Sequence, residues 1–236
     1  MKNNQKKLIV LPGWGGSKKT WNEFIVLSKG HFDLKIIELP CFGNEPCPTN
    51  IWGVEEYAQF VIESLKDEKD YTLLGHSFGG QVASYIAAND LLPINKLILT
   101  GAACIRKPNS IKKSIIKGTA KCIKLFFSIF GLKKIFGLLK PLLYKLIGLS
   151  DYNEATGIKK EILKKVVTQD LSDILPNIKT KTLVIWGSKD SYVSVKTGKT
   201  IAKLIPDADI IIYDGAKHGL HIDSTQKLIQ DIKKFI

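Results

Sequence analysis

The feature that most constrains this fold is a series of short apolar runs that alternate with helical stretches. We interpret as strands the runs at residues 8–11, 34–39, 71–75, 96–101, 182–187 and 209–215. Each run is apolar at consecutive positions, which is typical of strands that a parallel sheet buries on both faces. Parallel strands need long crossovers, and helical patterns at 18–29, 53–67, 78–89, 194–204 and 221–235 supply them. The sequence therefore predicts an α/β fold with a mostly parallel sheet of about six strands and helices on both faces.

One segment interrupts this alternation. Residues 102–178 have a helical pattern without a strand, and glycine and proline residues at 131, 137, 141 and 148 divide it. We therefore expect a core formed by residues 1–101 and 179–236, with 102–178 as a helical lid inserted between two strands.

The positive charge of the chain is concentrated in that insertion. The net charge is +13, and residues 103–150 hold eleven of the 35 basic residues and no Asp or Glu. The basicity is therefore local. The segment is apolar and lacks a known nucleic-acid-binding module, so we expect no nucleic acid partner. The chain also lacks dinucleotide and P-loop motifs and metal-ligand spacing, so we expect neither a cofactor nor a metal.

The cysteines and the N-terminus bear on the compartment. Cys41, Cys47, Cys104 and Cys122 form no C-x-x-C pair, and free thiols are the favoured interpretation. The alternative is a bridge between Cys41 and Cys47 across a short loop in an oxidising compartment. The first apolar run is too short for a secretory signal, and no run is long enough to span a membrane. We therefore expect a cytoplasmic protein.

The strongest chemical signal is GHSFGG at residues 75–80. It matches G-x-S-x-G and lies where that motif requires, after a buried strand and before a helix. The tight turn exposes the hydroxyl of Ser77, and the helix N-terminus behind it favours developing negative charge. The alternative is a Gly-rich phosphate-binding turn.

Five segments together resemble the α/β-hydrolase family over nearly the whole chain. They are LPGWGGS (11–17), LPCFGN (39–44), GHSFGG (75–80), WGSKDSYV (186–193) and GAKHGLH (215–221). Their order fits the family from its third core strand onward, so the first hairpin of the sheet is expected to be missing. Within the family, the chain looks most like small carboxylesterases, including the pimeloyl-carrier-protein methyl ester esterase group.

The resemblance implies a catalytic triad. Ser77 would be the nucleophile, His218 the general base in the loop after the last strand, and Asp190 the acid that orients the imidazole. The order Ser, Asp, His along the chain is the order expected for this fold. His221 remains the alternative base, and Asp214 the alternative acid.

The resemblance also implies the rest of the chemistry. Backbone N–H groups of Trp14 and Phe78 would form the oxyanion hole. A serine nucleophile points to acyl transfer through an acyl-enzyme, with a small-molecule carboxylic ester of short to medium acyl chain as substrate. Open alternatives are a thioesterase, a C–C bond hydrolase, an acyltransferase or perhydrolase, and a non-catalytic receptor of the same fold that binds a small molecule.

The lid would supply the substrate pocket. We expect the apolar side chains of Phe126, Phe127, Phe130 and Leu143 to face the acyl site, with the lysines of the lid in water. The basic segment 103–150 also suits contact with an anionic membrane surface or with an acidic carrier protein.

Overall fold

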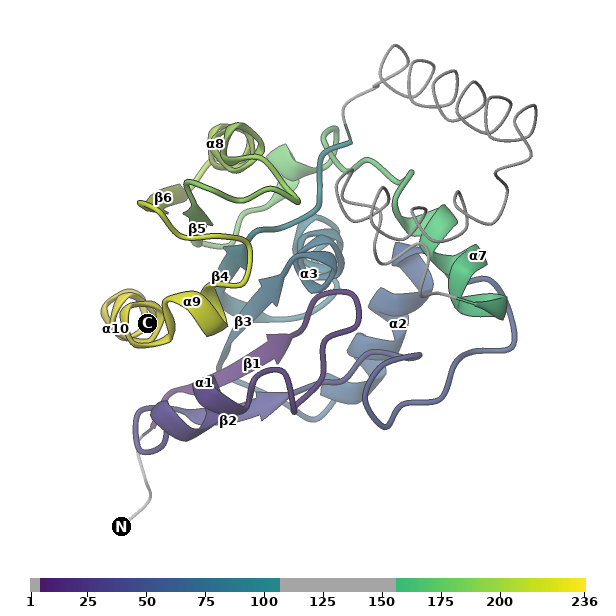
Figure 1. Cartoon of the computed structure of the whole chain (residues 1–236), viewed down its shortest axis with the longest axis horizontal. Coiled ribbons are helices and arrows are strands. Elements are labelled where there is room, and N and C mark those ends of the chain that lie inside the picture. The colour runs from purple at the N-terminus through teal and green to yellow at the C-terminus, as the bar shows by residue number, and fades with distance from the viewer. Residues whose placement is uncertain (1–4, 107–155) are drawn as a thin grey trace, which may run out of the picture.

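A computed structural model describes residues 5–106 and 156–236 of the chain. Its centre is one parallel sheet with the strand order β2-β1-β3-β4-β5-β6 (Figure 1). The strands are β1 (Lys7–Leu11), β2 (Asp33–Ile36), β3 (Tyr71–His76), β4 (Ile94–Thr100), β5 (Thr182–Gly187) and β6 (Ala208–Tyr213). The α/β fold and the parallel sheet expected from the sequence are confirmed.

Helices cover both faces of this sheet (Figure 1). One face carries α1 (Asn22–Leu27), α9 (Leu220–Asp223) and α10 (Thr225–Phe235), and the other carries α2 (Val54–Leu65), α3 (Phe78–Ala88) and α8 (Val195–Leu204). Helix α7 (Gly157–Val166) and a short 3-10 segment, η1 (Leu175–Asn177), precede β5.

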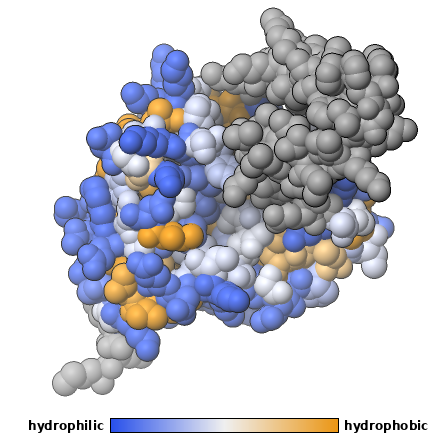
Figure 2. Space-filling model, viewed as in Figure 1, coloured by the Kyte–Doolittle hydropathy of each residue, from blue (hydrophilic) through white to orange (hydrophobic). Residues whose placement is uncertain are grey.

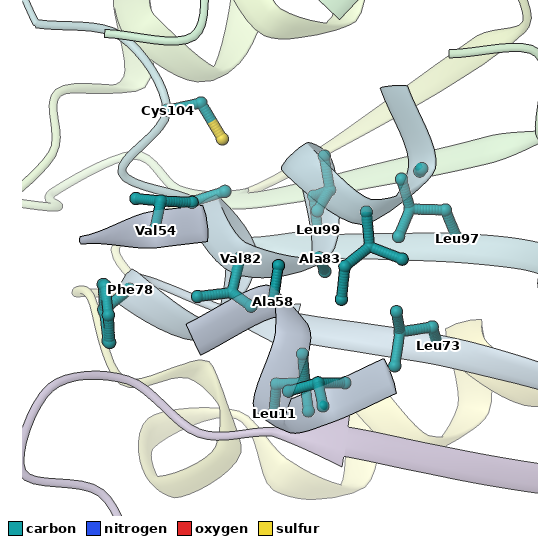
Figure 3. Packing of buried hydrophobic residues seen from close by; sticks show 14 of the residues in the cluster. Leu11, Val54, Ala58, Leu73, Phe78, Val82, Ala83, Leu97, Leu99 and Cys104 are labelled. Carbon is teal, nitrogen blue, oxygen red and sulfur yellow. The ribbon is translucent and has the colours of Figure 1, made fainter. Parts of the chain in front are cut away.

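The apolar runs feed two separate cores because successive strand residues point to opposite faces. In β1, Ile9 and Leu11 belong to the core beneath α2 and α3, whereas Leu8 and Val10 belong to the core beneath α1 and α10. Figure 3 shows part of the first core, where Leu11, Leu73, Leu97 and Leu99 of the strands lie near Val82 and Ala83 of α3. Full burial of each such side chain contributes roughly 1.5–3 kcal/mol.

The edge strands differ from the interior ones. Strand β2 ends at Ile36, not at residue 39, and β6 ends at Tyr213 before the turn at Gly215, which has a φ of +72°. Ile210 of β6 is 37% exposed, because an edge strand lacks a neighbour and full helical cover. The runs alone did not distinguish these partly exposed strands from the buried strands inside the sheet.

The free-thiol interpretation is wrong for two of the cysteines. Cys41 and Cys47 form a disulfide, while Cys104 is a free, buried thiol. The chain reverses between them, and the N–H of Cys41 donates to the carbonyl of Pro46 at 3.2 Å. That reversal brings the two sulfur atoms together, which spacing alone did not reveal.

Most of the expected lid lies outside the described residues, including Phe126, Phe127, Phe130 and Leu143. Its described ends contain α7 and η1 and no strand. Within residues 5–106 and 156–236, no helix has the length and hydropathy needed to cross a membrane. Figure 2 shows a largely hydrophilic surface over the described part of the face in view, with a few separate hydrophobic spots.

Candidate active site

Ser77 occupies the turn between β3 and α3. It is the single residue between His76 and Phe78, and its φ of +52° lies in the left-handed region that non-glycine residues seldom adopt. Backbone hydrogen bonds to the chain around the end of β4 hold it there. Its N–H donates to the carbonyl of Thr100 at 2.9 Å, and its carbonyl accepts the N–H of Ala103 at 3.0 Å. Both ends of the turn are thus fastened to the chain around the end of β4.

Glycines let other backbone segments approach this turn. A Cβ on Gly79 would lie 2.2 Å from the carbonyl oxygen of Leu11, and one on Gly75 would lie 2.6 Å from the Cα of Gly80. Real Cβ atoms do not approach so closely, so α3 can start against β1 only without these side chains. This packing explains the glycines of GHSFGG physically.

His218 and Asp190 meet at the same edge of the sheet. The Nδ1 of His218 lies 2.7 Å from Oδ2 of Asp190. Oδ1 of Asp190 accepts the N–H groups of Tyr192 and Val193, each at 2.8 Å, and the Asp190 side chain is 1% exposed. Both carboxylate oxygens therefore have partners. With Nδ1–H donating to the carboxylate, Nε2 of His218 is left as a proton acceptor.

The histidine lies over the strand ends next to Ser77. Its ring centroid is 4.8 Å from that of His76, and a Cβ on Gly101 would lie 2.9 Å from its Cε1 atom. Among the described residues, the Oγ of Ser77 makes no hydrogen bond, so the contact between Ser77 and His218 is not formed. Such contacts are often long without substrate and tighten when it binds.

Neither alternative residue is paired with His218. Asp214 accepts a hydrogen bond from Oγ of Ser188 at 3.0 Å. His221 is buried and stacks on Trp21, with ring centroids 4.1 Å apart and planes 5° from parallel. Burial, together with the nearby His218, lowers the pKa of His221 to about 4. His221 therefore packs as a neutral aromatic ring.

His76 is a second neutral imidazole. Its Nδ1 lies 3.0 Å from the carbonyl oxygen of Thr100 and 3.1 Å from the Oγ1 of the same residue. Burial, reinforced by the neighbouring His218 and His221, holds the pKa of His76 well below its usual range. The ring supports the turn beside Ser77 without adding charge.

The loop that carries Trp14 lies against the nucleophile. A Cβ on Gly13 would be 3.0 Å from the Cβ of Ser77. The ring of Trp14 packs edge-on against Phe42 and Phe78, with centroids 4.8 and 5.6 Å away. The N–H of Phe78 is in the first turn of α3, where backbone donors lack partners within the helix. The two expected N–H donors therefore both come from segments next to Ser77.

Two features of the site region were missed in the sequence. The stack of Trp21 on His221 had no local signal, because the residues are 200 positions apart. Glu38 had one signal, a carboxylate within the apolar run 34–39, and it proves to be buried beneath the loops of the site. No group of three or more His, Cys, Asp or Glu within the described ranges is arranged to hold a metal ion.

A parallel sheet with a serine on a strand-to-helix turn and a histidine–aspartate pair at the same edge defines the class of α/β-hydrolases. A family model described as serine aminopeptidase, S33, matches residues 53–225. The chain belongs to this family.

Individual relatives agree with this class. The pimeloyl-[acyl-carrier protein] methyl ester esterase of Wigglesworthia glossinidia brevipalpis is 29% identical, over 97% of this chain and 93% of the relative. Lipase 1 of Psychrobacter immobilis is 22% identical, over 97% of this chain and 76% of the relative. The structure of an esterase from Exiguobacterium antarcticum matches with a TM-score of 0.73 at 20% identity, covering 98% of this chain and 91% of that one. The chain is thus an enzyme, an α/β-hydrolase of the esterase and lipase type.

Proposed function

We propose that this enzyme hydrolyses carboxylic esters, with Ser77 as nucleophile, His218 as general base and Asp190 as the group that orients the histidine. The observation that carries the proposal is the 2.7 Å contact between His218 and Asp190, at the sheet edge where the Ser77 turn lies. The names of the relatives support an ester as the bond that is cleaved.

Acylation begins when the ester carbonyl lies beside Ser77. Nε2 of His218 takes the hydroxyl proton while Oγ attacks the carbonyl carbon. The resulting oxyanion accepts hydrogen bonds from the N–H groups of Trp14 and Phe78. His218 then gives its proton to the alcohol oxygen, the ester C–O bond breaks, and the acyl group remains on Ser77.

Deacylation repeats these steps with water. His218 takes a proton from water while the water oxygen attacks the acyl carbon. His218 then returns the proton to the Oγ of Ser77 as the bond between Oγ and the acyl carbon breaks, and the carboxylic acid is released. Asp190 holds the productive tautomer of His218 and stabilises the imidazolium that forms in each half-reaction. His76 and His221 stay neutral, so neither ring repels that imidazolium.

The proposed substrates have short to medium acyl chains. An apolar pocket discriminates chain length by only about 1–3 kcal/mol per methylene, so we expect the enzyme to accept several chain lengths. We propose that Phe126, Phe127, Phe130 and Leu143 of the lid line that pocket. A second candidate is a carrier-linked methyl ester, which the name of the 29% identical relative favours. The basic segment 103–150 would then contact the acidic carrier.

Hydrolysis of p-nitrophenyl acetate, butyrate and octanoate tests the proposal, with matched thioesters alongside. We expect Ser77→Ala to lower kcat by at least about 1,000-fold. Ser64→Ala, at a helix serine that bonds its own helix, is the matched control and should keep wild-type turnover. Equal turnover by wild type and Ser77→Ala would refute the proposal. Labelling of Ser77 by a fluorophosphonate without steady-state turnover would favour the receptor alternative.

A further inference from the structure

Glu38 is a buried carboxylate that joins two loops. It is 9% exposed; its Oε1 accepts the N–H of Lys18 at 2.7 Å, and its Oε2 accepts the N–H of Asn44 at 3.1 Å. Among the described residues, no lysine or arginine forms an ion pair with it. Glu38 and Asn44 both lie between β2 and α2, whereas Lys18 lies between β1 and α1, so the bond from Lys18 to Glu38 joins two separate loops.

The two loops carry residues that meet beside the nucleophile. The first loop joins β1 to α1 and contains Trp14 as well as Lys18. The second joins β2 to α2, contains Phe42, and is closed on itself by the disulfide between Cys41 and Cys47. The rings of Trp14 and Phe42 lie 4.8 Å apart. The loops are thus joined by the bond from Lys18 to Glu38 and by the contact between these two rings.

Gly43 shows how little freedom the carboxylate has. Its φ is +60°, and a Cβ on it would lie 2.3 Å from the Cδ of Glu38. The backbone of the second loop therefore passes directly over the carboxyl group. Glu38 is enclosed by its partners and cannot move without displacing a loop.

We infer that Glu38 is a positioning residue that holds the N–H of Trp14 at the oxyanion site; this inference rests on the proposed function. Hydrogen bonds from N–H groups to a carboxylate are short and strong. An oxyanion donor acts only within about 2.7–3.1 Å of the developing charge, so a small shift of the first loop weakens it. That contact belongs to the transition state and not to ground-state binding, so its loss lowers kcat and leaves KM in place.

Glu38→Gln is the first test, because it keeps the shape but turns one acceptor into a donor that faces an N–H. With p-nitrophenyl butyrate, kcat is expected to fall about tenfold or more, with KM changed by less than about twofold. Affinity for a trifluoromethyl ketone, which forms a tetrahedral oxyanion on serine, should fall in parallel. Glu68→Gln is the matched control, since Glu68 bonds Lys7 and Lys35 at the opposite end of the strands.

A second pair of variants tests the same contacts through Gly43, which lies on the same loop as Glu38. Gly43→Ala would push a methyl group against Glu38 and should give the same fall in kcat and in ketone affinity. Gly30→Ala controls for backbone strain, because Gly30 also has a positive φ, of +77°, but nothing lies within 4 Å of its Cβ position. This pair decides the question if Glu38→Gln does not fold, as judged by circular dichroism.

The possible results distinguish a failure of this inference from a failure of the proposed function. If the wild type is active and the Glu38 and Gly43 variants match their controls or change only in KM, the inference is wrong and the proposed function still stands. If the wild type hydrolyses p-nitrophenyl butyrate no faster than Ser77→Ala does, both the inference and the proposed function are wrong. Loss of kcat and of ketone affinity in the Glu38 and Gly43 variants, but not in the Glu68 and Gly30 variants, supports the positioning role.

Discussion

Three imidazoles lie together beside Ser77, but only one is arranged to carry charge. The ring of His76 is 4.8 Å from that of His218 and 4.9 Å from that of His221. Burial lowers the pKa of both His76 and His221. Of the three rings, only that of His218 has a carboxylate partner among the described residues, the side chain of Asp190.

The low pKa of His221 predicts a loss of stability in acid. As the pH falls below 6.5, the unfolded chain takes up this proton, whereas the folded chain does so only near pH 4. The contribution of His221 to the free energy of unfolding is therefore constant above pH 6.5. It falls by about 1.4 kcal/mol per pH unit as the pH decreases from 6.5 to about 4. Urea unfolding at pH 7.5, 6.0 and 5.0 measures this decrease in the free energy of unfolding.

His221→Phe is the matched variant for that measurement. It keeps an aromatic ring beside Trp21 and removes the titrating group, so its stability should decline less steeply with falling pH. The same slope in wild type and variant would contradict the assignment.

Asp190 and Asp214 offer a direct comparison of two acids near one histidine. Asp190→Asn removes the charge that fixes the His218 tautomer and should lower kcat by about 10³–10⁴-fold. Asp214→Asn removes the charge but keeps an oxygen that can accept the hydrogen bond from Ser188, and should stay within about twofold of wild type. Steady-state kinetics on p-nitrophenyl butyrate decides between them, and a greater loss in the Asp214 variant would identify it as the acid.

At the scale of elements, the sequence predicted best what local pattern determines. Strand β5 has the expected limits of 182 and 187, because its run is apolar throughout and ends in a glycine. The edge strands β2 and β6 end before the predicted residues, because their limits depend on neighbouring strands that the local sequence does not reveal. The Asp190–His218 contact was expected from the resemblance. The disulfide was only the less favoured alternative and the Glu38 contacts were not predicted, because both depend on how loops fold back on themselves.

Helix α8 packs so tightly on β5 that a favourable helix substitution should harm it. A Cβ on Gly198 would lie 2.5 Å from the ring of Trp186, which is fully buried and donates through Nε1 to the carbonyl of Val193. Gly198→Ala gains up to about 1 kcal/mol of helix propensity, but overpacking costs about 1–3 kcal/mol. We expect a net loss of stability in urea unfolding.

Thr200→Ala, on the exposed side of α8, controls for the change in helix propensity and should shift stability by less than about 0.5 kcal/mol. A Gly198→Ala variant more stable than wild type would show that α8 can move away from the ring.

For the whole molecule, the disulfide bears on where the enzyme works. Disulfides persist in oxidising compartments, so the bond between Cys41 and Cys47 weighs against the cytoplasmic expectation.

Removal of the disulfide should weaken the molecule modestly. The bond closes a loop with a sequence separation of six, so the double variant Cys41→Ser/Cys47→Ser should lose about 2 kcal/mol of unfolding free energy. Urea unfolding with and without reductant measures the difference, and the double variant itself should not respond to reductant. Alkylation of Cys41 and Cys47 in unreduced native protein would show that the bond does not form.

The site is divided along the chain. Ser77 follows β3 in the first half, whereas Asp190 and His218 follow β5 and β6, the last two strands. In the proposed mechanism, a nascent chain that stops before β6 therefore contains the nucleophile, Ser77, but not its general base, His218. Turnover by the proposed mechanism therefore requires that β5 and β6 have joined the sheet and brought Asp190 and His218 to the edge where Ser77 lies.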